Sequence, residues 1–154
     1  MSIFFADEQS VPVEADPLVA LAELVLVEQD IPTDVEMSVL LVTSEQIAEY
    51  NERFMSKSGP TDVLSFPIVD LAPGERPRRV PNGPPTAIGD VFICPEVVRA
   101  NAGASGVPFE DEMALMVVHG ILHLLGFDHQ VDDEAEIMES READILAKIG
   151  KTRP

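Results

Sequence analysis

The chain has no tryptophan and a single cysteine, and aromatic residues make up only 5% of its 154 positions. One cysteine, Cys94, excludes an intrachain disulfide and is typical of proteins from a reducing compartment. Because 45% of the residues are nevertheless hydrophobic, the scarcity of aromatics predicts a core built from aliphatic side chains. We expect residues 1–154 to form one domain that is large enough to fold without disulfide cross-links.

Positive charge is also scarce, and it is unevenly placed. Ten Lys and Arg stand against 28 Asp and Glu, which gives a net charge of −18 and disfavours non-specific attraction to DNA or anionic lipid. No basic residue precedes Arg53, and half of the ten lie between positions 53 and 79. If the protein binds a polyanion, residues 53–79 are therefore the predicted contact. The acidic residues within 130–146 are predicted to lie on solvated helix faces.

Long hydrophobic runs are missing as well. The longest uncharged apolar run, residues 113–127, contains two histidines and is shorter than the roughly 20 residues that span a bilayer. Residues 1–10 include no basic residue and only a short apolar stretch, which is not the pattern of a secretory signal. We therefore expect a soluble, cytoplasmic protein with no membrane partner.

The remaining patterns predict alternating strands and helices. Asp16 as N-cap before Pro17 marks the start of one helix, and Thr43 with Ser44 caps another. Pro67 indicates an edge strand or a strand end. The predicted strands cover residues 2–6, 36–43, 62–69 and 88–94; the predicted helices cover 18–27, 45–55, 95–102, 109–125 and 133–149; residues 70–87, with five prolines, form a loop. This mixture predicts an α+β (mixed α/β) fold in which helices cover one sheet.

All three histidines lie in one short window, HGILHLLGFDH, which runs from His119 to His129. His119 and His123 are four positions apart on a predicted helix, so their imidazoles project from one face. Gly126 ends that helix and accepts a positive φ, which lets His129 return toward the same point. Three imidazoles with an open fourth position are typical of catalytic zinc. We therefore predict one Zn²⁺ per chain, although paired core histidines are the alternative.

The histidine spacing also matches the metzincin pattern H-E-x-x-H-x-x-G-x-x-H at every position but one. Where a zinc protease has its glutamate, immediately after His119, this chain has Gly120. Glycine cannot accept a proton, so a peptidase would need a general base from elsewhere in the fold. The pattern therefore favours a metal enzyme of another class.

Together with PTDVLSFP (60–67) and GDVFICPE (89–96), the histidine window closely resembles the YbeY family of bacterial metal-dependent endoribonucleases. The three blocks occur in the family's order, so the resemblance covers nearly the whole chain. It implies a mixed sheet of about four strands packed by helices, a zincin-like histidine helix, and zinc held by His119, His123 and His129. It further implies 16S rRNA 3′-end maturation and ribosome quality control, with rRNA, the small ribosomal subunit and ribosome-associated proteins as partners.

Polar residues around the PTDVLSFP block are predicted to bind the RNA. Thr61, Asp62 and Ser65 stand at the start of a strand, where they would line a cleft beside the zinc, but Pro-Thr-Asp is also an ordinary turn sequence. The predicted substrate-binding residues are Lys57, Thr61, Asp62, Ser65, Arg76, Arg78 and Arg79. Asp128 would either orient an imidazole or cap the following turn.

Two further residues have structural interpretations. Gly89 with Asp90 is predicted to form a bulge or the entry of a strand. Cys94 follows an apolar strand and is predicted to be a buried small hydrophobic residue rather than a metal ligand.

One feature of the family is missing. Many members have an Arg shortly before the PTDVLSFP block that is associated with RNA cleavage, and in an ungapped alignment its place is taken by Met55. Methionine has no charge and no guanidinium fork for a phosphate. Arg53 and Lys57 flank it as candidate substitutes, so the catalytic residue is unassigned. The alternative function is a metal-stabilised ribosome-assembly or binding factor with little or no cleavage activity.

Overall fold

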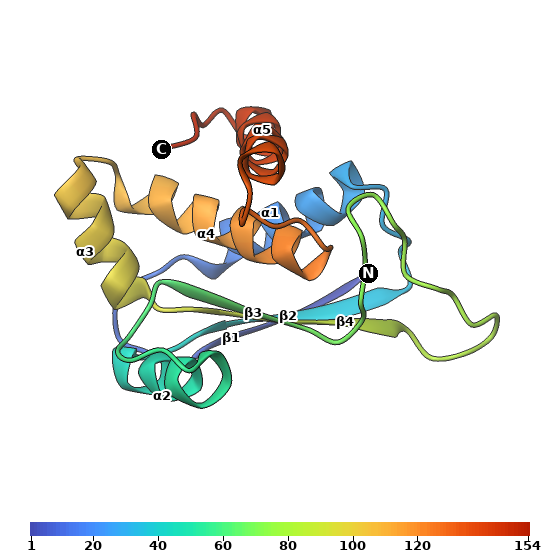
Figure 1. Cartoon of the computed structure of the whole chain (residues 1–154), viewed down its shortest axis with the longest axis horizontal. Helices are drawn as coiled ribbons and strands as arrows, with labels where there is room; N and C mark the ends of the chain where they lie inside the picture. Colours follow the sequence, from blue (N-terminus) through green and yellow to red (C-terminus); the bar gives the residue numbers. More distant parts are fainter.

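A computed structural model describes all 154 residues as a mixed sheet with helices on both faces (Figure 1). The strands are β1 (Ser2–Asp7), β2 (Val35–Leu41), β3 (Val63–Pro67) and β4 (Thr86–Ile93), and the helices are α1 (Ala15–Glu28), α2 (Ser44–Met55), α3 (Pro95–Ser105), α4 (Phe109–Leu124) and α5 (Asp132–Lys148). The predicted α+β class and the four-stranded mixed sheet are confirmed. None of these helices combines the length and the hydropathy that a bilayer crossing requires.

The strands lie in the order β1-β2-β4-β3. β1, β2 and β4 are parallel, and β3 runs antiparallel to β4. Pro67 is the last residue of the edge strand β3, as predicted, and there its missing N–H group costs no ladder bond. The pairing of β2 with β4 shifts register between Ala87 and Gly89, inside β4, so of the two interpretations of Gly89 with Asp90 the bulge is confirmed and the strand entry is wrong.

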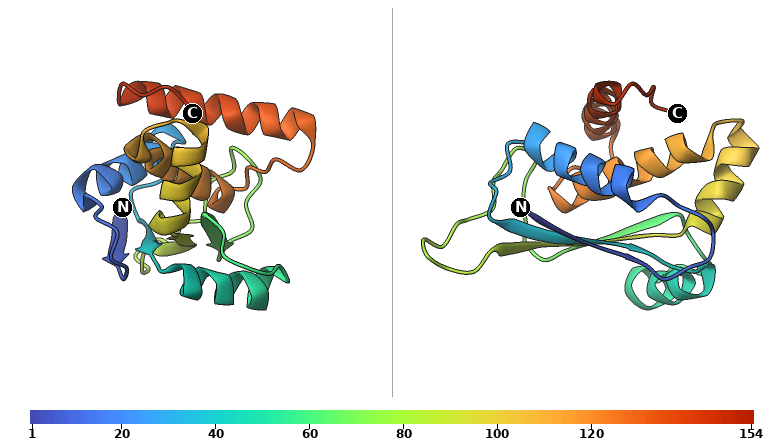
Figure 2. Two further views of the ribbon diagram at one scale, coloured as in Figure 1. Left: turned by 90° about the vertical axis from the view of Figure 1, so that its left-hand side faces the viewer. Right: turned by 180° about the vertical axis from the view of Figure 1, so that it is seen from behind.

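The helices form layers around this sheet (Figure 2). α1 and α4 pack on one face, α5 lies across them on their outer side, α2 covers part of the opposite face, and α3 stands at one end. α4 is the most deeply buried helix: Val117, Val118 and Ile121 have no exposed surface. Phe127 is the only aromatic residue among the buried hydrophobic residues, which confirms the aliphatic core.

Of the two predicted helix N-caps, that of α1 is wrong and that of α2 is confirmed. α1 has Glu14 as its N-cap, so the predicted Asp16 cap is wrong, and Asp16 and Pro17 lie within the first turn. Pro17 is tolerated there because the first N–H groups of a helix have no intrahelical acceptor. Thr43 caps α2 as predicted: the Gln46 N–H donates to Thr43 Oγ1 over 3.2 Å, and Gln46 Oε1 accepts from the Thr43 N–H over 3.1 Å.

Cys94 lies at the end of β4 as the N-cap of α3, and it is fully buried. Burial raises the pKa of its thiol, which disfavours the thiolate form that binds metals. The prediction of a buried small hydrophobic residue is confirmed.

Candidate metal centre and cleft

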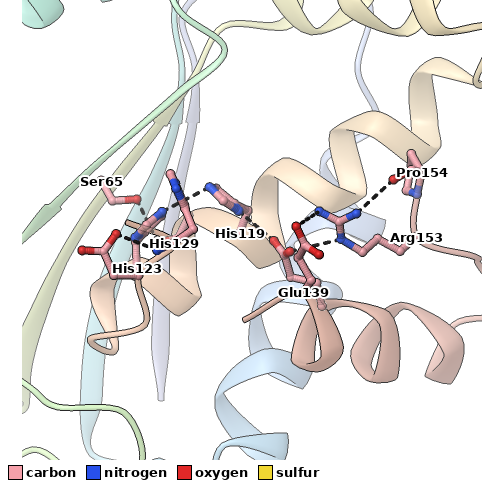
Figure 3. A network of polar contacts seen from close by, with 10 residues as sticks. Ser65, His119, His123, His129, Glu139, Arg153 and Pro154 are labelled. Carbon is pink, nitrogen blue, oxygen red and sulfur yellow. Dashed lines mark hydrogen bonds and ion pairs between the residues drawn. The ribbon is translucent and has the colours of Figure 1, made fainter. Parts of the chain in front are cut away.

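The C-terminal end of α4 brings the three histidines together (Figure 3). His119 and His123 project from one face of the helix. Gly126 then adopts a φ of 97°, as predicted, and the turn that follows returns His129 to the same point. One candidate ligand nitrogen from each histidine lies within 4.8 Å of the other two. No fourth side chain belongs to this group, which leaves room for a water or a substrate atom.

The spacing of the nitrogens fits a tetrahedral ion. Nε2 of His119 and Nε2 of His123 are 3.1 Å apart, and ligand nitrogens about 2.05 Å from a tetrahedral zinc would be separated by about 3.3 Å. Burial, followed by the neighbouring His119 and His129, lowers the pKa of His123. This favours the neutral imidazole that a metal requires. Three imidazoles without a thiolate suit zinc and other divalent first-row metals.

The packing around position 120 explains why a glycine, and not a glutamate, follows the first histidine of this helix. A Cβ atom at position 120 would lie 2.5 Å from Cγ1 of the buried Val91 and 3.3 Å from Cγ2 of Val63. Position 120 therefore faces the sheet, and α4 approaches β3 and β4 too closely for a side chain there. The Gly120 carbonyl also accepts a hydrogen bond from Ser65 Oγ over 2.8 Å, which ties the histidine helix to the edge strand.

We expect Gly120→Ala to destabilise the protein by about 1 kcal/mol, because overpacking costs about 1–3 kcal/mol and the better helix propensity of alanine returns up to about 1 kcal/mol. Urea unfolding measures this loss. In the double variant Gly120→Ala/Val91→Ala, the new methyl group fills the space that the valine leaves. The double variant should therefore lose less free energy of unfolding than the two single variants lose in sum. Strictly additive costs would contradict the close approach.

A cleft of about 650 Å³ opens beside the histidines. Its wall includes the end of α2, the loop that follows it, β3, and the segment after Pro67. Of the predicted substrate-binding residues, the lining includes Lys57, Thr61, Asp62 and Ser65, and it does not include Arg76, Arg78 and Arg79. Lys57 is the only lysine or arginine in the cleft, where Asp62, Asp70 and Asp128 supply carboxylates.

Two of the acidic residues that line the cleft accept hydrogen bonds from nearby backbone N–H groups. Asp62 Oδ1 accepts the Val63 N–H over 2.8 Å and lies 3.3 Å from Thr61 Oγ1, so this carboxylate orders the turn before β3. Asp128 Oδ1 accepts the backbone N–H of His129 over 2.7 Å. Of the two interpretations of Asp128, the structure therefore shows the turn cap rather than a bond to an imidazole.

Two of the three arginines within residues 70–87 pair with the turn between α1 and β2. Arg79 Nε donates to Asp34 Oδ2 over 2.8 Å, and Arg76 Nη2 lies 3.9 Å from Asp30 Oδ2. Arg78 is exposed. These positive charges remain accessible, but they lie outside the cleft.

Met55 lies in the cleft wall at the end of α2, with 39% of its surface exposed. Arg53 is outside the lining, and its guanidinium lies over the Phe54 ring, 5.9 Å from the centroid. The helix ends because Ser56 adopts a left-handed φ of 54°, which turns Lys57 into the cleft.

Two residues of the site were missed in the sequence. Asn51 is a buried residue of α2 whose side-chain amide donates to the Gly59 carbonyl over 2.9 Å, which fixes the loop behind Lys57.

The second residue, Glu142 on α5, is 1% exposed, and its Oε2 lies 2.7 Å from Nδ1 of His119. The expectation that the acidic residues of 130–146 are solvated is therefore wrong for Glu142. The sequence did hold a signal for this burial, because the apolar residues Met138 and Leu146 lie one helical turn before and after Glu142. Both are buried on the same face of α5.

Comparison with known proteins agrees with this geometry. The family model described as Endoribonuclease YbeY matches residues 5–150. The chain belongs to the YbeY family. It is 43% identical over 147 residues to the endoribonuclease YbeY of Thermobifida fusca, with 96% of this chain and 93% of that protein covered. It is 41% identical over 157 residues to the endoribonuclease YbeY of Salinispora tropica, with 99% of both chains covered.

A solved structure shares the fold of this YbeY-family chain. The solution structure of TM1509 from Thermotoga maritima superposes with a TM-score of 0.61 at 25% sequence identity. The match covers 96% of this chain and 91% of that one, so it includes the sheet and the histidine helix together.

Proposed function

We propose that the protein is a zinc-dependent single-strand endoribonuclease that acts in the cytoplasm on rRNA of the small ribosomal subunit. The observation that carries this proposal is the convergence of three imidazoles beside a cleft whose histidine helix lacks the protease glutamate. Membership of a family whose relatives are named endoribonucleases supports RNA as the substrate. The proposed process is maturation of the 16S rRNA 3′ end, with a role in ribosome quality control.

His119, His123 and His129 would hold the zinc, which in such a site acts as a Lewis acid and lowers the pKa of bound water. Lys57 would neutralise a backbone phosphate, because it is the one lysine or arginine of the cleft. Thr61, Asp62 and Ser65 would shape the wall against which the strand lies. With 28 acidic residues in the chain, local positive charge must offset the repulsion of RNA by the whole molecule.

The proposal is tested by incubating the purified protein with a structured fragment of the 16S rRNA 3′ region, an unrelated single strand of equal length, and a peptide library. We expect cleavage of RNA only, loss of cleavage after chelation, and recovery when zinc is returned. Preference for the rRNA fragment supports the assigned process. Turnover of peptides, or RNA cleavage unaffected by chelation, would contradict the proposal.

Met55 favours a second candidate, an assembly or binding factor with a metal-stabilised fold and little cleavage activity. The cleft position that carries an arginine in many family members here presents an uncharged thioether. Stoichiometric binding of the small subunit without RNA turnover, under the same conditions, would support this candidate against the nuclease.

We expect the double variant Arg78→Ala/Arg79→Ala to bind RNA more weakly and with a shallower dependence on salt. Each lost phosphate contact lowers the log–log slope by about 0.7 for a single strand. The matched control is Arg99→Ala/Lys148→Ala, which removes the same charge from exposed positions on α3 and α5. Fluorescence anisotropy across a salt series measures both slopes. Equal slopes in the two double variants would mean that residues 70–87 are a solvated connector.

A further inference from the structure

A buried carboxylate joins the histidine cluster to the segment that follows α5. Glu142 Oε2 lies 2.7 Å from Nδ1 of His119, and Glu142 Oε1 accepts from Arg153 Nε over 3.2 Å. Nη2 of Arg153 also lies 3.9 Å from Oε1 of Glu139, and Nη1 of Arg153 donates to the Pro154 carbonyl over 3.2 Å. Figure 3 shows this network running from His123 through His119 to Arg153.

The contact determines which nitrogen of His119 is available. A carboxylate only accepts hydrogen bonds, so Nδ1 of His119 carries the proton that it donates to Glu142. Nε2 then has its lone pair free, and this is the nitrogen that lies 3.1 Å from Nε2 of His123 at the cleft. Glu142 is not part of the cleft lining, so it acts on the centre through His119 and not on a substrate.

Arg153 offsets the cost of burying this carboxylate. An ionised carboxylate removed from water is unfavourable unless it is paired and hydrogen-bonded. The guanidinium of Arg153 provides that pair, with 30% of its side chain exposed. Its segment is anchored independently, because Lys151 Nζ donates to Asp111 Oδ1 on α4 over 2.6 Å and the Lys151 N–H donates to the Leu146 carbonyl over 3.0 Å.

We propose that Glu142 and Arg153 are positioning residues of the metal centre. Glu142 orients the His119 ring and fixes its tautomer, and Arg153 holds Glu142 in place from the segment after α5. This inference rests on the proposed metal site. Carboxylate partners of metal-binding histidines are a general means of orienting a ligand, and here the same carboxylate links the centre to α5 and to the chain beyond it.

The test measures zinc affinity by competition with a chromophoric chelator. We expect Glu142→Gln to weaken zinc binding about 10- to 100-fold, the usual effect of losing such a partner. Arg153→Ala should have a smaller effect in the same direction, and Arg153→Lys should recover part of it by restoring the charge. The control is Arg141→Ala, which removes an exposed arginine beside Glu142 and should leave the affinity unchanged.

A second measurement separates positioning from mere support of the fold. In zinc-loaded protein labelled with ¹⁵N histidine, the Nδ1–H of His119 should be visible and slow to exchange, and Glu142→Gln should accelerate its exchange. If Glu142 only supports the fold, Glu142→Gln will lower the free energy of unfolding but leave the zinc affinity and the Nδ1–H signal of His119 unchanged. That result would overturn the inference. If the wild type binds no zinc, the proposed metal site itself is wrong, which is a distinguishable failure.

Discussion

Replacing His123 with alanine is expected to abolish stoichiometric zinc binding. His123 is the middle ligand of the cluster: its Nε2 is 3.1 Å from that of His119, and its ring centroid is 5.0 Å from that of His129. Without it, two imidazoles remain, those of His119 and His129 with ring centroids 5.4 Å apart, and no other cysteine, histidine or carboxylate belongs to the group. Elemental analysis after gel filtration should find about one zinc per wild-type chain and none in the variant.

The matched control is Cys94→Ala, because Cys94 carries the only thiol of the chain and thiolates are common zinc ligands. It is buried outside the cleft, so this variant should retain its zinc. Zinc should also stabilise the wild type against urea by about 2.7 kcal/mol at a free concentration 100 times the dissociation constant, and it should not stabilise His123→Ala. Full zinc retention in a folded His123→Ala variant would end the three-histidine hypothesis.

Much of this fold could be predicted because its signals are local. The Thr43 cap, the Gly126 turn and the break at Pro67 each depend on backbone chemistry within a few residues, and all three occur where the sequence places them. The histidine cluster was predictable for the same reason, since a helical spacing followed by a glycine turn fixes three side chains without reference to the rest of the molecule.

The missed features depend on partners that are distant in the sequence. Glu142 resembles its solvated neighbours until His119, 23 positions away, is placed beside it. The ion pairs of Arg76 with Asp30 and of Arg79 with Asp34 likewise join segments that are distant in the sequence, so no local pattern indicates them. From sequence alone, a charged side chain is predicted to be exposed, because its partner in the folded chain is not known. Sites that depend on ion pairs between distant elements are therefore not predicted by the sequence pattern.

Met55→Arg is expected to accelerate single-turnover RNA cleavage by about 10²–10³-fold, the usual value of one donor that stabilises developing charge. Met55 lies in the cleft wall with the histidines, so a guanidinium at this position would reach a phosphate bound there. RNA affinity should change little, because backbone contacts are distributed over several residues. Rapid-quench kinetics at saturating protein measure the cleavage step, and anisotropy measures the affinity.

Three further variants test which side chain near position 55 acts on the bound phosphate. Met55→Lys adds the same charge without the planar fork, so an acceleration well below that of Met55→Arg would show that bidentate geometry matters. Arg53→Ala and Lys57→Ala test the flanking substitutes. Arg53 is held over Phe54 outside the cleft, so its loss should leave cleavage unchanged, whereas Lys57 lines the cleft and its loss should weaken binding. Fast wild-type cleavage that collapses in either variant would instead assign the stabilisation of phosphate charge to that residue, and Met55→Arg would then add nothing.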